Sequence, residues 1–81
     1  MLLPDKHIKM SESLLGLGSF LLATLRKPMT IDAMWFEYSK AREDGTYPAH
    51  HTFENVVLAL DVLFALGAIS TQKNGLIEKC D

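Results

Sequence analysis

The 81-residue sequence contains a single cysteine, Cys80, one residue from its end. One cysteine excludes an intramolecular disulfide and a zinc site built on paired thiolates. A GxxxxGK phosphate-binding loop is also missing, and the Gly16-Leu17-Gly18 segment falls within an apolar helical pattern. His50 and His51 are adjacent, and adjacent histidines seldom converge on one metal ion. We therefore expect no metal, no cofactor and no catalytic residue, and we predict that the chain is not an enzyme.

Long uninterrupted apolar runs are absent as well. Glycines interrupt the first apolar segment and Asp61 interrupts the last, so neither reaches the roughly 18 to 20 residues of a membrane span. The first ten residues contain Pro4 and Asp5 and lack the basic-then-apolar pattern of a signal peptide. These features predict a cytoplasmic protein without a membrane segment.

No part of the chain is strongly basic. Eight Lys and Arg residues stand against ten Asp and Glu residues, which gives a net charge of −2, and the basic residues are scattered. Nucleic-acid-binding domains usually carry a basic stripe. The charge balance therefore argues against direct nucleic-acid binding.

The sequence does contain three helical patterns followed by a hairpin pattern, within one domain of residues 1–81. An N-terminal arm is expected at residues 1–10, helices at 11–26, 30–42 and 52–66, and a hairpin at 68–80. The predicted fold class is mainly α with a C-terminal β-hairpin, in the order of a winged helix-turn-helix protein.

Helix ends and the turn of the hairpin are marked by particular residues. Ser11 or Ser13 can cap the first helix, Thr30 the second and Thr52 the third, and Gly67 supplies the left-handed residue that ends the third. Asn-Gly at positions 74 and 75 indicates a hairpin. We expect a three-residue loop with Gly75 left-handed, which places Ile69, Thr71 and Ile77 on one face.

The third helix has two apolar faces. Its predicted core face is the larger of the two and comprises Phe53, Val56, Val57, Leu60, Leu63 and Phe64. A second stripe of Leu58, Val62 and Leu66 follows at i, i+4 and i+8, roughly opposite the first. Either the arm or the first helix covers this stripe, or the stripe is exposed and binds protein. The helix has no Lys or Arg to contact DNA phosphates.

Phe36 points away from the core face of the second helix, and an exposed aromatic side chain either has no role or anchors an interface. The predicted protein interface is therefore Phe36, Leu58, Val62 and Leu66. Two alternatives remain open. A DNA-binding regulator, or a DNA-contacting subunit, would use Lys40, Arg42, Lys73 and Lys79 for phosphates, and a homodimeric structural module would bury the stripe against a second copy.

Three segments carry a resemblance to a known family: PDKHIKMSESLLGLGSFLL, FENVVLALDVLFALGAI and NGLI. In this order they resemble the small middle components of bacterial ABC-three-component systems, over nearly the whole chain. The resemblance implies a gene encoded between an effector and a large coiled-coil ABC-class ATPase, in systems thought to act in antiviral defence. It also implies a non-enzymatic adaptor that connects or restrains these two proteins, with ATP bound by the ATPase.

Overall fold

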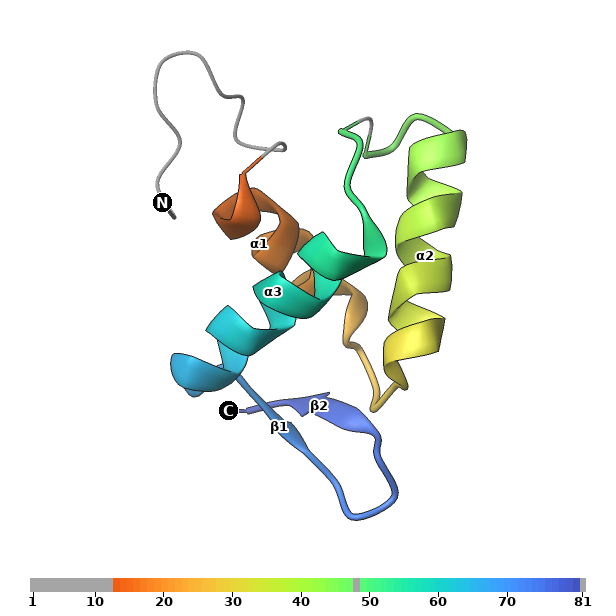
Figure 1. Ribbon diagram of the computed structural model, residues 1–81. Helices are drawn as coiled ribbons and strands as arrows, with labels where there is room; N and C mark the ends of the chain where they lie inside the picture. Colours follow the sequence, from red (N-terminus) through yellow and green to blue (C-terminus); the bar gives the residue numbers. More distant parts are fainter. Residues whose placement is uncertain (1–12, 48, 81) are drawn as a thin grey trace.

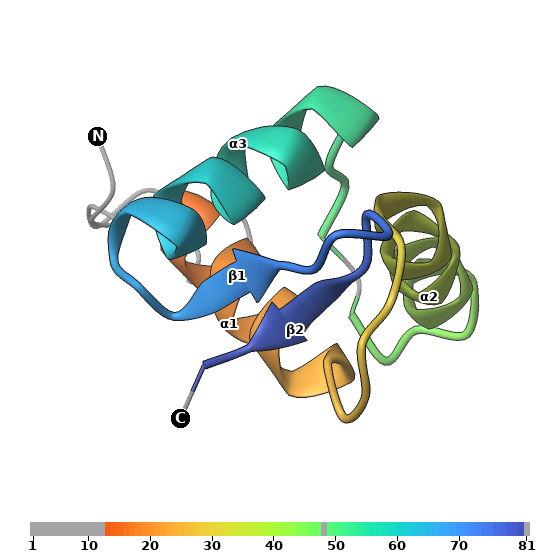
Figure 2. The ribbon, with the colours of Figure 1, turned by 90° about the horizontal axis from the view of Figure 1, so that it is seen from below.

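The computed structural model describes residues 13–47 and 49–80, and the predicted arm at 1–10 lies outside them. The secondary structure consists of α1 (Leu14–Thr24), α2 (Ile31–Glu43), α3 (Phe53–Ala65), β1 (Ile69–Thr71) and β2 (Ile77–Lys79). α1 and α3 pack side by side, α2 stands beside the pair, and the antiparallel β1–β2 hairpin lies across one end (Figures 1 and 2). The predicted mainly helical fold with a C-terminal hairpin is confirmed.

Each of the three helices begins at a cap that the sequence predicts. The side-chain oxygens of Ser13, Thr30 and Thr52 accept hydrogen bonds from the backbone N–H three residues further on, at 2.9, 3.1 and 3.1 Å. Each such cap contributes about 0.5 to 2 kcal/mol because it satisfies an otherwise unpaired donor. The alternative start at Ser11 lies outside the described residues.

α1 is shorter than predicted, because it ends at Thr24 and not at Arg26. Leu25 leaves the helical conformation with φ −81° and ψ 63°, and its N–H donates to the carbonyl of Leu22. Pro28 then disfavours helical backbone at the residue before it. Arg26 and Lys27 therefore lie in the segment that connects α1 to α2. α2 extends one residue beyond the prediction, and α3 lies within the predicted range.

The hairpin has the expected register. Thr71 pairs with Ile77 and Ile69 with Lys79, around a loop of residues 73–75 in which Gly75 has φ +85°. Ile69 and Ile77 consequently share a face and are both buried in the core. Gly67, with φ +77°, ends α3 as predicted.

A third extended segment, absent from the prediction, joins the hairpin. The N–H of Met29 donates to the carbonyl of Ile77 at 2.9 Å, and the N–H of Ile77 donates to the carbonyl of Met29 at 2.7 Å. Pro28, just before Met29, favours extended over helical backbone at Lys27, so the chain approaches Met29 outside a helix. This pairing fixes the α1–α2 connection, with Arg26 and Lys27, against β2.

The core lies where the three helices and the hairpin meet. It is built mostly from leucines and other aliphatic side chains: Leu17, Leu21, Leu25, Met34, Tyr38, Val56, Ala59, Leu60, Leu63, Ile69 and Ile77. Tyr38 is its largest fully buried side chain. Its hydroxyl donates to the carbonyl of Ala49 at 2.7 Å and accepts from the N–H of His51 at 2.6 Å. These bonds attach the α2–α3 loop to α2.

The predicted core face of α3 is partly wrong. Phe53 and Phe64 remain 40% and 37% exposed, whereas Ala59, which the predicted core face does not include, is buried. The physical reason is the packing of α3 against α1, where Gly18, which has no side chain, lies against Leu63 and the buried arc of α3 turns toward α1. Among residues 13–47 and 49–80, no helix has the length and apolar character that crossing a bilayer requires.

Candidate protein-binding surface

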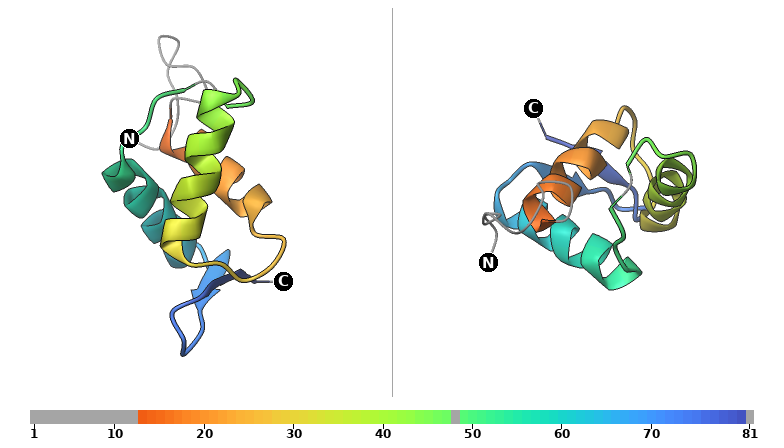
Figure 3. Two further views of the ribbon diagram at one scale, coloured as in Figure 1. Left: turned by 90° about the vertical axis from the view of Figure 1, so that its right-hand side faces the viewer. Right: turned by 90° about the horizontal axis from the view of Figure 1, so that it is seen from above.

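The predicted second stripe of α3 is largely exposed. Leu58 is 49% exposed and Leu66 is 71% exposed, while Val62 between them is half-buried. α1 lies beside α3 (Figure 3), and Leu15 and Leu22 of α1 line a hollow together with Val62. The interpretation that α1 buries the whole stripe is therefore wrong. The predicted arm, the other element proposed to cover the stripe, lies outside the described residues.

A small hollow separates the stripe from α1. It is lined almost entirely by apolar groups of the two helices: Leu14, Leu15, Gly18, Ser19, Leu22, Ala59, Val62, Leu63 and Leu66. The side chain of Leu15, on the α1 rim, is 39% exposed. The exposed apolar surface thus extends from α3 onto α1.

The other side of α3 is apolar at its first turns. A hollow of about 340 Å³ is lined there by Phe53, Glu54, Val57 and Leu58. The ring of Phe53 packs edge-on against Trp35 of α2, with centroids 5.6 Å apart. Contiguous exposed apolar surface is characteristic of sites that contact another molecule.

Phe36 is exposed, as predicted, but it belongs to a different surface. It lies on α2 and is 60% exposed, with the Lys40 ammonium 5.5 Å from its ring centroid. Lys40 also forms a 3.8 Å ion pair with Glu37. Neither hollow beside the stripe includes Phe36. The four predicted interface residues therefore form a stripe and a separate aromatic site.

The four cations predicted for the DNA alternative come from three elements. Lys40 and Arg42 lie on α2, Lys73 lies in the hairpin loop, and Lys79 lies on β2. Lys79 lines a hollow of about 340 Å³ in company with two cations that the prediction omitted, Arg26 and Lys27.

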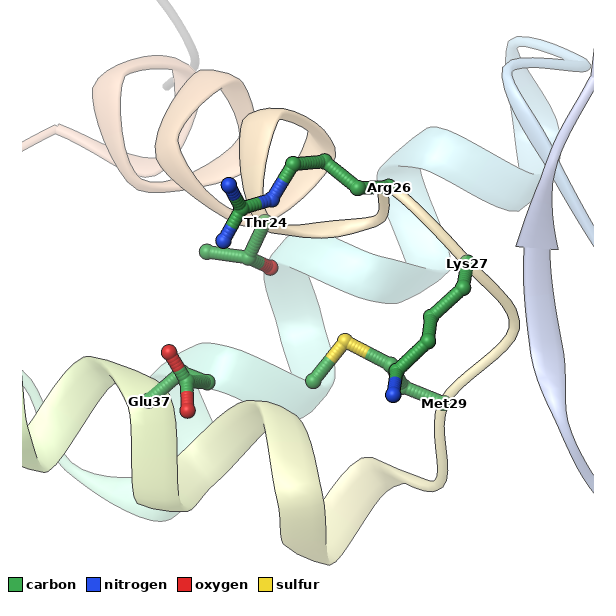
Figure 4. A pocket seen from close by; sticks show the side chains of 5 residues that line it. All are labelled: Thr24, Arg26, Lys27, Met29 and Glu37. Carbon is green, nitrogen blue, oxygen red and sulfur yellow. The ribbon is translucent and has the colours of Figure 1, made fainter.

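We call Arg26, Lys27 and Lys79 the basic corner. Arg26 and Lys27 also line a second hollow of about 410 Å³, where Glu37 projects from α2 across from them (Figure 4). Sequence reasoning missed this cluster because it ended the first helix at Arg26 and considered Arg26 and Lys27 only as the basic end of that helix. The Met29–Ile77 pairing that brings them to β2 has only Pro28 as a local signal.

His51 is packed within the domain, whereas the adjacent His50 is exposed. His51 is 3% exposed, its ring stacks on Tyr47 with centroids 6.2 Å apart, and its Nδ1 lies 3.2 Å from the Asn55 amide nitrogen. Burial, with a smaller contribution from nearby Tyr38, raises the pKa of the Tyr47 phenol. Within the described part of the chain, no three His, Cys, Asp or Glu side chains are placed to hold a metal ion.

Comparison with known families decides the assignment. The family model of the ABC-three component (ABC-3C) system Middle Component 6 matches residues 3–80. The chain belongs to this family. The resemblance seen in the sequence is thus confirmed, and this Middle Component 6 chain is a component of a multi-component ABC system. No curated protein and no solved structure matched the chain.

Proposed function

We propose that this Middle Component 6 chain is a non-enzymatic adaptor in an antiviral defence system of the bacterial cytoplasm. In this proposal the stripe of Leu58, Val62 and Leu66 binds the coiled-coil ABC-class ATPase of the system. The observation that carries the proposal is the exposure of Leu58 and Leu66 on a helix that has no cation. Fully burying an exposed leucine side chain contributes about 1.5 to 3 kcal/mol, so burial of Leu58 and Leu66 would stabilise contact with a partner.

The fold supports the choice of α3 as the binding element. Three helices are followed by a hairpin, and Met29 adds a short third pairing to it, as in a winged helix. α3 then occupies the place of the recognition helix. Its outer face presents Glu54 and Asp61, which repel phosphate, so its target is apolar.

An adaptor that connects two proteins needs a second surface, and Phe36 provides one. The ring is exposed on α2, apart from the stripe, and large aromatic residues are frequent anchors at interfaces. We assign this site to the effector of the system.

A second candidate function is contact with nucleic acid through the basic corner. Three of the six cations among the described residues gather there. Lys73 at the hairpin tip would extend this surface. Phosphate contacts of this kind weaken steeply as salt rises, whereas apolar contacts do not. The salt dependence of binding therefore distinguishes the two candidate functions.

The test is capture of the tagged chain from cells that co-express the ATPase and the effector, with labelled duplex DNA added. We expect the ATPase to be retained at 50 mM and at 500 mM salt (roughly a tenfold range, over which phosphate contacts fail). The Leu58→Asp, Leu66→Asp double variant should lose the ATPase, and Phe36→Asp should lose the effector alone.

A matched control adds two negative charges elsewhere. Thr71→Asp with Asn74→Asp alters the exposed hairpin, and an aspartate at 74 can still accept the hydrogen bond from the Leu76 N–H. This control should retain both partners. Capture of DNA without the ATPase, lost at high salt, would replace the adaptor proposal with the second candidate. A chain that captures only further copies of itself would indicate the homodimeric module.

A further inference from the structure

The size of the hollow between α1 and α3 limits which partner side chains can enter it. Its volume is about 60 Å³, and its floor includes Gly18 and Ala59, which carry little or no side chain. An enclosed apolar cavity of roughly 150 Å³ holds benzene, so this hollow is small for an aromatic ring. The tip of one aliphatic side chain fits, as a knob fits a hole between packed helices.

We infer that the hollow receives an aliphatic side chain from an amphipathic helix of the partner, and that this helix carries Lys or Arg where it passes Glu54 and Asp61. The inference rests on the proposed function and adds the chemical character of the partner segment.

A helix suits the shape of the surface. Leu58, Val62 and Leu66, the C-cap residue of α3, span eight residue steps, a rise of about 12 Å, or roughly two turns. Leu15 and Leu22 of α1 line the opposite side of the hollow. Amphipathic helices bind such apolar grooves through anchors at helical spacing. A partner strand would need unpaired backbone N–H and C=O groups to bond with, and the backbone groups of α3 are already paired within the helix.

The charged side chains of the two helices that line the hollow are all acidic. α1 contains no charged residue, and α3 contains only Glu54 and Asp61, both exposed. They lie four residues before and three residues after Leu58, so helical spacing places both next to Leu58, on the side of the stripe that faces away from α1. Basic partner residues would be attracted there and acidic residues repelled, with an effect mainly on association rate.

The first arm of the test fills the hollow. A Cβ added at Gly18 would meet Leu63 Cδ2 at 3.6 Å, which is an ordinary contact, so Gly18→Ala is compatible with the fold. Gly18→Met places a longer chain in the same space. With the purified ATPase immobilised for surface plasmon resonance, we expect Gly18→Met to weaken binding at least tenfold and Gly18→Ala about threefold, a loss that follows the volume filled.

The second arm reverses the acidic charges. Glu54→Lys with Asp61→Lys should slow association at least tenfold at 50 mM salt and much less at 300 mM, where charges are screened. Asp32→Lys with Glu43→Lys makes the same change in net charge on exposed positions of α2 and should leave the rate within about twofold of the wild-type value.

The outcomes separate the inference from the proposed function. If the wild-type chain binds the ATPase but all Gly18 variants bind equally well, or the acid reversal does not slow association, the inference is overturned and the adaptor role stands. If the wild-type chain does not bind the ATPase, both the inference and the proposed function fail. A dimer of the chain alone that Gly18→Met dissociates would assign the hollow to a second copy. Tighter ATPase binding after Leu2→Asp with Leu3→Asp would assign it to the chain's own first residues.

Discussion

Replacing Leu21 with Ala is expected to remove roughly 3 to 5 kcal/mol of unfolding free energy, whereas the same replacement at Leu66 should remove less than about 0.5 kcal/mol. Leu21 is fully buried between the helices, and truncation there leaves a cavity. Leu66 is 71% exposed, so its truncation leaves none. An 81-residue domain has a total stability of about 4 to 12 kcal/mol, so Leu21→Ala removes at least about a quarter of it.

Urea denaturation followed by circular dichroism measures both changes. The two variants lose the same atoms from the same residue type, so the difference between their midpoints isolates the effect of burial. A loss above about 2 kcal/mol for Leu66→Ala would mean that Leu66 packs in the core and is not available to a partner.

Replacing Tyr38 with Phe should cost about 2 to 4 kcal/mol, since its hydroxyl makes two buried hydrogen bonds. The change leaves the carbonyl of Ala49 and the N–H of His51 without this partner, at residues only 7% and 3% exposed. An unsatisfied buried group costs about 1 to 3 kcal/mol. The α2–α3 loop, and with it the start of α3, should become less well fixed.

Ser39→Ala is the control for Tyr38→Phe, because it removes a hydroxyl from the next residue of the same helix. Ser39 is only partly buried, and its loss should change stability by less than about 0.5 kcal/mol. Denaturation midpoints give the comparison, and amide exchange at residues 49–55 reports on the loop. Equal midpoints for the two variants would contradict the role given to the Tyr38 hydroxyl.

The elements of the fold could be predicted from the sequence because their signals are local. Ser13, Thr30 and Thr52 act as caps through bonds to residues three positions away, and Gly75 sets the hairpin loop by its own backbone angle. Such signals lie within a few residues of the element that they define.

What the sequence did not predict depends on contacts between distant segments. The pairing of Met29 with Ile77 joins residues that are far apart in the chain. The pattern of apolar residues around either position is too short to predict it. The burial of Ala59 in place of Phe53 follows from how closely α1 approaches α3, which the helical pattern of α3 alone does not contain. The stripe was predicted because it is a property of one helix. The basic corner was not, because it is assembled from two segments.

The adaptor role is tested most directly by calorimetric titration of the purified ATPase with the purified chain at several temperatures. Contact through the stripe predicts saturable binding with a negative heat-capacity change, the signature of apolar surface removed from water. The Leu58→Asp, Leu66→Asp double variant should show at least a hundredfold weaker binding, about 2.7 kcal/mol. Absence of binding by the wild-type chain, or binding that the double variant leaves unchanged, would contradict the proposal.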